Sequence, residues 1–321
     1  MKVLVVGHIH QDGISLLQAR ADLSIEITEA HKESDLVKLV PEVDAILVRS
    51  ALITSPIIEA APLLKVVSRH GVGFNSVDLE TLTARRIPLT IAVGGNAVSV
   101  AEHTLYLILA LAKQGKRYDT AARQGDFNFR NAPIAHEIET SKLLVIGFGR
   151  IGTQVTRRAL AFGMSVHVYD PYVPDSLIED LDAHVIRNLH DALPQMDVVS
   201  VHCPLNDETK HLIGNSELSL MKPNALLINT ARGGIVDETA LHSALLQGEI
   251  AGAGIDVFVT EPTNPSLNLL GLKNVVVSPH CAGVTVESSA RTARIAAQNT
   301  LNGLDSTLDE VFVVNREVLL H

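Results

Sequence analysis

The chain has 321 residues, of which 46% are hydrophobic and 19% are charged. This composition provides enough apolar material for about two packed domains, which excludes a disordered protein and a small disulfide-stapled scaffold. Acidic residues outnumber basic ones by 36 to 26, for a net charge of −10, whereas nucleic-acid binding usually needs a basic surface. No uncharged apolar stretch reaches the roughly 18 residues that a membrane span needs. We therefore expect neither a nucleic acid nor a membrane as partner.

Cysteine and histidine content gives two further expectations. Cys203 and Cys281 are the only cysteines, and the chain starts without a basic and then apolar leader. Both features favour the reducing cytoplasm over a disulfide framework. His8 and His10 resemble a metal-binding pair, but a metal site needs three or four converging ligands and no third one is nearby. We therefore expect no metal site.

Strand-like and helix-like segments alternate along almost the whole chain. Short apolar runs predict strands at 3–6, 45–48, 65–68, 143–146, 166–169, 198–201, 225–229, 254–257 and 275–278. Amphipathic stretches between them predict helices at 13–20, 153–162 and 287–301. This alternation is typical of α/β folds with parallel sheets and helical crossovers.

A long helical pattern at 96–113 interrupts the alternation. Ser99 followed by Glu102 resembles a capping box at its start. From 105 to 112 the pattern is apolar all round, so both sides of the helix should be buried. The pattern fits a core helix between domains and equally a helix shared with a second subunit.

The order of these elements predicts two Rossmann-like, doubly wound parallel-sheet α/β domains. The last helix should return to the first domain, which makes that domain discontinuous. We place the substrate (catalytic) domain at 1–98 plus 287–321 and the cofactor domain at 99–286.

The segment KLLVIGFGRIG (142–152) carries a glycine motif between a strand and a helix. Gly147 should permit a tight turn, Gly149 should let the backbone approach a pyrophosphate, and Gly152 should let the helix pack on the strand. The start of the helix then offers N–H groups and a positive dipole to phosphates. The intervening Phe148, Arg150 and Ile151 belong to the same predicted site.

Asp170 lies 21 residues beyond Gly149, at the tip of the next predicted strand. A carboxylate there accepts hydrogen bonds from the adenosine ribose and repels the 2′-phosphate of NADP. The sequence therefore predicts NAD as the cofactor.

Three ionisable residues follow later predicted strands: Arg232, Glu261 and His280. Ligands bind outside the carboxyl ends of strands in such sheets, so these side chains could converge there. A guanidinium binds a carboxylate, an imidazole exchanges the hydroxyl proton, and a glutamate orients the imidazole. The set suits proton and hydride exchange on a 2-hydroxy acid.

The ordered motifs resemble those of the D-isomer-specific 2-hydroxyacid dehydrogenases, an NAD-dependent family, over nearly the whole chain. The matching segments are RHGVGFNSVDLE (69–80), NAVSVAEHT (96–104), VIGFGRIG (145–152), VHCPLNDETKHLIG (201–214), NTARGGIVDE (229–238) and the segments around Glu261 and His280. The resemblance implies that Arg232 binds the substrate carboxylate, His280 is the acid and base, and Glu261 supports His280.

The resemblance also implies further cofactor and substrate contacts. Besides the glycine loop, Asp170 and the catalytic pair Arg232 and His280, the cofactor contacts would be His202, Cys203, Pro204, Thr209, Thr230, Ala231 and Asp256. The loop Gly71, Val72 and Gly73 would bind the substrate carboxylate through backbone N–H groups. The family is usually a homodimer joined around the long helix, which favours a dimer through 96–113.

Within the family, the segment Val48-Arg49-Ser50 resembles the 3-phosphoglycerate dehydrogenases, in which an arginine faces the substrate phosphate. Arg49 and Ser50 are therefore expected to contact the substrate tail, although a surface arginine capping a strand is the alternative. His70 replaces a small residue beside the carboxylate loop and is a further expected substrate contact.

The expected activity is reversible hydride transfer between NAD(H) and a small, 3-phosphoglycerate-like 2-hydroxy acid. One alternative is a hydroxypyruvate or glyoxylate reductase. Another, from a different class, is a non-catalytic NAD-sensing co-regulator, because a fold does not guarantee an activity. About 40 residues follow His280, so we expect no C-terminal regulatory domain.

Overall fold

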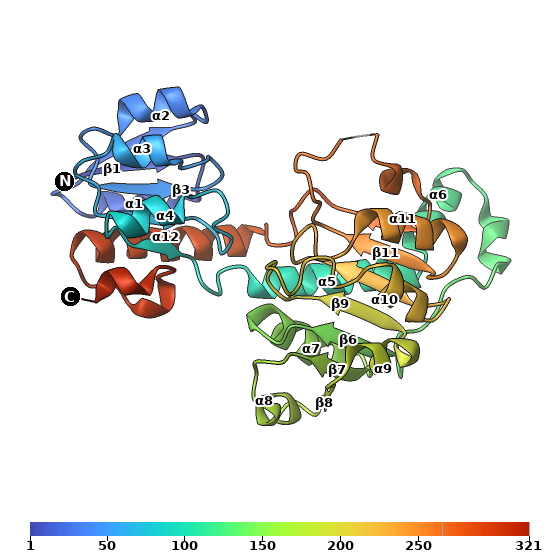
Figure 1. Ribbon diagram of the computed structural model, residues 1–321. Helices are drawn as coiled ribbons and strands as arrows, with labels where there is room; N and C mark the ends of the chain where they lie inside the picture. Colours follow the sequence, from blue (N-terminus) through green and yellow to red (C-terminus); the bar gives the residue numbers. More distant parts are fainter. Residues whose placement is uncertain (265, 321) are drawn as a thin grey trace. The chain divides into compact units, whose positions relative to one another are not determined.

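The computed structural model describes residues 1–264 and 266–320. The chain forms two compact units (Figure 1): the first combines Met1–Asn96 with Val284–His321, and the second is Ala97–Gly283. Each unit is built on one parallel sheet with helices on both faces, which confirms the predicted fold class.

The first unit has a five-stranded parallel sheet in the order β2-β1-β3-β4-β5. Its strands are β1 (Lys2–Val6), β2 (Ser24–Thr28), β3 (Ala45–Val48), β4 (Val66–Arg69) and β5 (Leu89–Ile91). Its helices are α1 (Gln11–Gln18), α2 (Glu33–Leu39), α3 (Ser55–Glu59), α4 (Leu79–Ala84) and α12 (Val286–Leu304), with short 3₁₀ turns η4 (Glu310–Phe312) and η5 (Arg316–Leu319).

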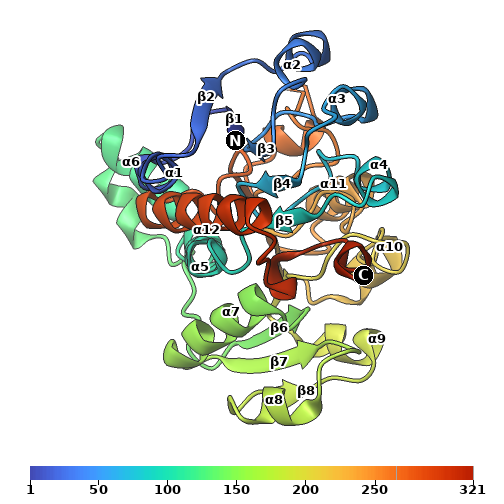
Figure 2. The same cartoon turned by 90° about the vertical axis from the view of Figure 1, so that its left-hand side faces the viewer.

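The fully apolar strand β1 shows why the first sheet is covered on both faces. Val3 and Val5 pack in the cluster that α1 and α12 complete, while Leu4 and Val6 pack in the cluster formed with α2, α3 and α4. Side chains alternate along a strand, so a continuous apolar run needs two apolar layers. Figure 2 shows α1 and α12 side by side against the sheet, although they come from opposite ends of the chain.

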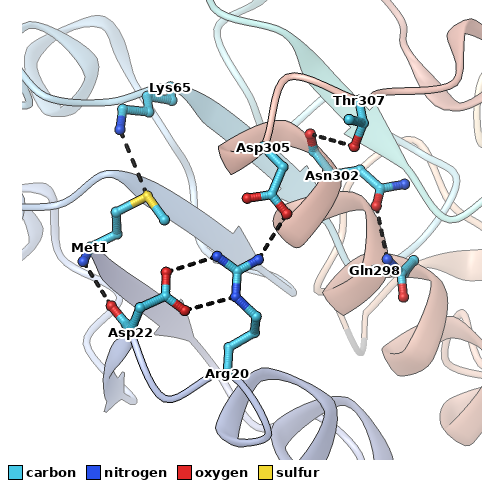
Figure 3. Close-up of polar contacts among 8 residues, drawn as sticks. All are labelled: Met1, Arg20, Asp22, Lys65, Gln298, Asn302, Asp305 and Thr307. Atoms are coloured by element: carbon cyan, nitrogen blue, oxygen red, sulfur yellow. Dashed lines mark hydrogen bonds and ion pairs between the residues drawn. The ribbon is translucent and has the colours of Figure 1, made fainter.

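An ion-pair cluster joins these two helices at one end (Figure 3). The Arg20 guanidinium binds both carboxylate oxygens of Asp22 at 2.8 Å and also Asp305, just beyond α12, at 2.8 Å. Arg20 lowers the pKa of Asp22 to about 2 by hydrogen bonding to its charged form. The Met1 ammonium donates to the Asp22 carbonyl at 2.9 Å, so both terminal segments of this unit meet here.

The second unit has a seven-stranded parallel sheet in the order β12-β11-β10-β9-β6-β7-β8. Its strands are β6 (Lys142–Ile146), β7 (Ser165–Tyr169), β8 (His184–Val185), β9 (Val198–Val201), β10 (Leu226–Asn229), β11 (Gly252–Ile255) and β12 (Val275–Val277). Its helices are α5 (Ala97–Ala112), α6 (Gly115–Arg123), α7 (Arg150–Ala161), α8 (Asp175–Glu179), α9 (Leu189–Ala192), α10 (Asn215–Leu220) and α11 (Glu238–Gln247), with 3₁₀ turns η1 (Phe127–Asn131), η2 (Leu193–Gln195) and η3 (Asn268–Gly271).

Both sheets have a point at which the strand order reverses. In the second unit the chain runs outward from β6 through β7 and β8, then returns to β9 on the other side of β6. In the first unit β1 lies between β2 and β3 and plays the same part. Ligands of doubly wound sheets bind outside the carboxyl ends of the strands at such points.

The structure corrects two expectations for the long helix α5. The helix begins at Ala97, so Ser99 lies inside it and the proposed capping box is wrong; Glu102 instead pairs with Arg158 at 3.3 Å. The apolar stretch is not buried all round, because Tyr106 is 55% exposed. The buried side, which includes Leu107 and Ile108, packs on β10 and β11 and on α7.

Strand β11 lies two residues earlier than the predicted 254–257. The glycines that begin it have low strand propensity, which hid the strand in the sequence. They are needed because α5 packs directly on them: a Cβ on Gly254 would lie 2.9 Å from the Leu107 Cβ atom, and one on Gly252 would lie 3.2 Å from a Leu111 methyl.

Candidate active site in the second unit

Two of the three motif glycines are required by close backbone packing. Gly147 follows β6 with φ of +95°, and a Cβ there would lie 2.6 Å from the Cys203 nitrogen. A Cβ on Gly152, inside α7, would lie 2.1 Å from the Gly147 carbonyl oxygen. Any larger residue would therefore separate the helix from the strand.

Gly149 has a different role, because no described atom lies within 4 Å of where its Cβ would be. It is the N-cap residue of α7, and no described side chain caps that helix start. The first N–H groups of α7 therefore face open space with the positive end of the helix dipole. This arrangement fits the pyrophosphate of a dinucleotide, as the motif predicts.

Asp170 follows β7 and holds the glycine loop as well as its own turn. Its Oδ2 atom accepts the Phe148 N–H at 2.7 Å, and its Oδ1 atom accepts the N–H groups of Tyr172 and Val173 at 2.9 and 3.2 Å. A carboxylate has about four acceptor positions, so Oδ2 can still accept a ribose hydroxyl. The residues present therefore fit a dinucleotide.

The other predicted cofactor residues lie at the same sheet edge. Arg150 and Ile151 form the first turn of α7, whereas Phe148 is buried in the core and offers only its backbone. His202, Cys203, Pro204 and Thr209 follow β9, and Thr230 and Ala231 follow β10. The loop after β9 is internally bonded, since the Thr209 hydroxyl donates to the Pro204 carbonyl at 2.6 Å. Burial lowers the pKa of His202 to about 3 and raises that of Cys203 to about 11.

The structure brings His280 and Glu261 into direct contact. The His280 Nδ1 atom lies 2.6 Å from the Glu261 Oε2 atom, and Oε1 of Glu261 accepts the Phe258 N–H at 2.9 Å. The carboxylate is thus fixed by the backbone and in turn orients the imidazole. This contact leaves the Nε2 atom of His280 as the ring nitrogen for proton exchange.

Arg232 lies in a turn that follows β10. Asn229 closes the turn, since its amide donates to the Arg232 carbonyl at 2.9 Å and its oxygen accepts the Ala231 N–H at 3.0 Å. The turn packs tightly on the next loop, because a Cβ on Gly233 would lie 2.1 Å from the Phe258 carbonyl. Burial lowers the pKa of the Arg232 guanidinium, and the charge of Glu261 opposes that shift.

Asp256 is almost completely buried, with 1% exposure. Its Oδ1 atom accepts the Ser278 hydroxyl at 2.5 Å and the Cys281 N–H at 2.9 Å, and its Oδ2 atom accepts the Ala282 N–H at 3.0 Å. The residue therefore organises the loop that carries His280. The nicotinamide contact expected for Asp256 stays a prediction.

The predicted substrate residues of the first unit lie at the carboxyl edge of its own sheet. Arg49 and Ser50 follow β3, and an Arg49 guanidinium N–H donates to the His8 carbonyl beyond β1 at 2.8 Å. His70 and the loop 71–73 follow β4. Burial, together with the charges of Arg49 and Arg69, lowers the pKa of His70 to about 4.

Sequence reasoning missed several residues that support these groups. Asn229 and Ser278 are each the last residue of a predicted strand, and that position was the available signal. Arg69 is the last residue of β4; its guanidinium donates to the His70 carbonyl at 2.6 Å. Among the residues that the structure describes, there is no group of three or more possible metal ligands and no helix long and apolar enough to span a membrane.

Comparison with known proteins identifies the family. Residues 105–282 match the sequence model of the "D-isomer specific 2-hydroxyacid dehydrogenase, NAD binding domain". The chain belongs to the D-isomer specific 2-hydroxyacid dehydrogenases. It is 36% identical to a D-3-phosphoglycerate dehydrogenase of Methanocaldococcus jannaschii over 97% of this chain and 59% of that protein. It is 36% identical to a hydroxypyruvate reductase of Thermotoga maritima over 90% of this chain and 94% of that protein.

A solved structure agrees with this membership. D-Lactate dehydrogenase from Aquifex aeolicus, complexed with NAD and lactic acid, superposes with a TM-score of 0.86 at 31% identity, over 98% of this chain and 99% of that one. The second unit is thus an NAD-binding domain of this family. The chain spans 59% and 57% of the two archaeal phosphoglycerate dehydrogenases that it matches.

Proposed function

We propose that this protein catalyses reversible hydride transfer between NAD(H) and a small 2-hydroxy or 2-oxo acid. The observation that carries the proposal is the 2.6 Å contact between His280 and Glu261 at the carboxyl edge of the dinucleotide-binding sheet. A backbone-held carboxylate paired with an imidazole is the arrangement of a general acid and base with its orienting group. Substrate binding is assigned to the first unit together with Arg232 and His280, and cofactor binding to the second unit.

In the direction of the 2-oxo acid, NADH held by the glycine loop and Asp170 would supply the hydride that the carbonyl carbon needs. Protonated His280 gives its Nε2 proton to the carbonyl oxygen, and Glu261 stabilises the positive imidazolium in the ground state. Arg232 binds the substrate carboxylate with two parallel N–H donors and stabilises negative charge on the carbonyl oxygen. The half-buried position of Arg232 strengthens this interaction, because fewer waters compete for the guanidinium.

The first unit favours a substrate with a phosphorylated tail, as in 3-phosphoglycerate. Arg49 and Ser50 lie at the carboxyl end of β3, beside β1, where the strand order of that sheet reverses. Arg69 and His70 end the neighbouring strand β4. Two guanidinium groups at the carboxyl edge of a doubly wound sheet suit a doubly charged anion better than a neutral hydroxyl.

A second candidate, an unphosphorylated acid, is favoured by a different observation. The Thermotoga maritima relative is named a hydroxypyruvate reductase, and the match covers 94% of its length, against 59% of the Methanocaldococcus jannaschii phosphoglycerate dehydrogenase. The same catalytic residues would serve this substrate, and Arg49 would then lie outside the reaction. The two candidates differ only in what the first unit recognises.

The test is NADH oxidation with a panel of 2-oxo acids: 3-phosphohydroxypyruvate, hydroxypyruvate, glyoxylate and pyruvate. Each acid is assayed with the wild type, with Arg49→Ala and with the exposed-site control Arg316→Ala. Turnover concentrated on the phosphorylated acid and reduced about 10-fold or more by Arg49→Ala supports the phosphorylated substrate, because a charged hydrogen bond is lost. Turnover on an unphosphorylated acid, unaffected by Arg49→Ala, selects the reductase. NADH binding without turnover on any acid would favour the co-regulator.

The exposed side of α5 supports a homodimer as part of the same proposal. Its apolar groove is lined by Leu105, Tyr106 and Leu109 from α5 and by Phe162 just after α7, and Tyr106 and Phe162 are 55% and 47% exposed. A second copy of this helix would cover the groove, with the same surface on both subunits. We also propose a cytoplasmic location, since Cys203 and Cys281 are both free thiols.

Sedimentation of the wild type and of Tyr106→Glu tests the dimer. The buried charge should convert the dimer to a monomer at micromolar concentration, whereas Tyr172→Glu, at a tyrosine that is 75% exposed, should leave it unchanged. A monomeric wild type would contradict the proposed dimer.

A further inference from the structure

The imidazole of His103, on α5, reaches the loop that carries His280. Its Nε2 atom lies 2.8 Å from the Ser278 hydroxyl oxygen, two residues before His280. We propose that His103 is a positioning residue that acts through Ser278 and Asp256 to hold the His280 loop. The predicted effect of His103 on turnover rests on the proposed function. The hydrogen-bond network does not, and it lies wholly within the second unit.

The directions of the hydrogen bonds in this network follow from the atoms present. Asp256 is a carboxylate and only accepts, so the single Ser278 hydroxyl proton goes to its Oδ1 atom, at 2.5 Å. The Ser278 oxygen can then only accept from His103, which requires a proton on Nε2. Both the protonated ring and the neutral Nε2–H tautomer have this proton. The network therefore does not depend on the charge of His103.

The network ends on the backbone that follows the catalytic histidine. The Asp256 carboxylate accepts the N–H groups of Cys281 and Ala282 at 2.9 and 3.0 Å, and the Asp256 carbonyl accepts the N–H of His280 at 2.8 Å. Three consecutive backbone N–H groups are thus held by one buried residue. The carboxylate keeps its hydrogen bonds to Cys281 and Ala282 only while it stays in this orientation.

His280 needs such support because its backbone is in an unfavourable region. Its φ is +51°, the left-handed region that residues with a Cβ rarely occupy. Such conformations persist where the surrounding structure fixes them, and they are frequent at active sites. The fixed network from His103 to residues 281 and 282 supplies that constraint on the C-terminal side of His280.

The surroundings of His103 favour its hydrogen bond to Ser278 over a role in packing alone. The side chain of His103 is 19% exposed and its Nε2 atom lies 3.9 Å from the Asp256 Oδ1 atom, so it lies over the nearly buried carboxylate. The next residue, Thr104, is completely buried and bonds the Thr230 hydroxyl at 3.0 Å, at the end of β10. Adjacent polar residues of α5 thus reach two strand ends that carry predicted site residues.

The test compares His103→Leu with His103→Gln, because the glutamine amide can still donate to Ser278 and leucine cannot. His103→Leu should lower kcat about 10-fold and change the KM for NADH less than about twofold, because His280 is displaced by a fraction of an ångström. It should also increase deuterium exchange at the amides of Cys281 and Ala282. His103→Gln should retain kcat within about threefold and the wild-type exchange. His136→Leu, at an exposed histidine of the same unit, is the matched control.

Several results would overturn the proposal. Equal losses in His103→Leu and His103→Gln would mean that the ring acts by its shape, and wild-type behaviour of His103→Leu would mean that it does not act at all. Ser278→Ala should behave as His103→Leu does, and the double variant should lose no more than either single one; additive losses would also contradict the network. If the wild type turns over no oxo acid, the proposed function fails, while the exchange measurement still decides the role of His103.

Discussion

The carboxyl edges of the two sheets differ in how their charges are satisfied. In the second unit, Asp170, Asp256 and Glu261 each accept backbone N–H groups, and Glu261 also fixes His280. In the first unit Arg49 donates to the His8 carbonyl, and within residues 1–264 and 266–320 no carboxylate forms an ion pair with Arg49. Three carboxylates of the second edge are thus held by hydrogen bonds, whereas the Arg49 guanidinium of the first edge has no carboxylate partner among the described residues.

This difference separates two tasks that an enzyme of this family has to perform. Acid and base chemistry needs groups held in one geometry before substrate arrives, which the hydrogen bonds of the second edge provide. Selection among 2-oxo acids needs charge that is available to a ligand, and in the proposed function Arg49 at the first edge supplies it. Substitution of His280 at the second edge should therefore change the rate, whereas substitution of Arg49 at the first edge should change which acid is preferred.

The largest effect should come from His280→Ala. Removal of the acid and base should lower kcat by about 10³-fold, whereas the affinity for NADH should stay within about threefold, because the glycine loop is untouched. Steady-state kinetics and calorimetric NADH titration measure the two quantities. His211→Ala, at an exposed histidine of the same unit, should leave both unchanged. Normal turnover in His280→Ala would remove this residue from the acid and base role.

Arg232→Lys should act mainly on substrate binding. An ammonium cannot form the two parallel N–H bonds of a guanidinium, so the KM for the oxo acid should rise about 10- to 100-fold. Arg187→Lys, an exposed arginine that pairs with Asp175, is the control. An unchanged KM in Arg232→Lys would show that the substrate carboxylate binds elsewhere.

The fold and the residues of the second edge were predictable because they follow local sequence patterns. Gly147 and Gly149 connect β6 to α7 and Gly152 lies in the first turn of α7; Gly147 and Gly152 face close backbone contacts, whereas Gly149 has none within 4 Å. Apolar runs such as the one in β1 identify buried parallel strands whatever their partners are. The family resemblance was confirmed by the match to residues 105–282.

The supporting residues were less accessible to sequence reasoning, because their partners are distant in the chain. Ser278 meets His103 across 175 residues, and Asp256 meets Cys281 across 25. The start of β11 was misplaced because its glycines are explained only by the contact with Leu107. The capping box at Ser99 was wrong because α5 already begins at Ala97, so Ser99 is not the residue that precedes the helix.

Asp170→Ala tests the cofactor side of the second edge. Loss of the negative charge should lower the preference for NAD over NADP, measured as the ratio of kcat/KM values, by about 10-fold or more. Since Asp170 also accepts the Phe148 N–H at 2.7 Å, the alanine variant should bind NADH more weakly as well. Asp170→Asn keeps one acceptor oxygen and should show the change of preference with a smaller loss of affinity. If the ratio is unchanged in both variants, another residue determines the preference.

The smallest predicted effect is a loss of folding stability in acid. It depends on His70, at the first edge. Burial and the nearby Arg49 and Arg69 lower the pKa of His70 to about 4, while an unfolded histidine has a pKa of about 6.5. Between these values the unfolded chain binds the proton and the folded chain does not. The contribution of neutral His70 to the free energy of unfolding is therefore fully present above about pH 6.5 and is lost as the pH drops toward 4.

His70→Gln should remove this dependence, which amounts to at most about 1.4 kcal/mol per pH unit between pH 6 and 4.5. Urea unfolding of the wild type, of His70→Gln and of the exposed-site control His8→Gln at several pH values measures the slope. The wild type and His8→Gln should share one slope, and His70→Gln should have a shallower one. A shared slope for all three would mean that neither burial nor the nearby Arg49 and Arg69 lower the pKa of His70 in the folded chain.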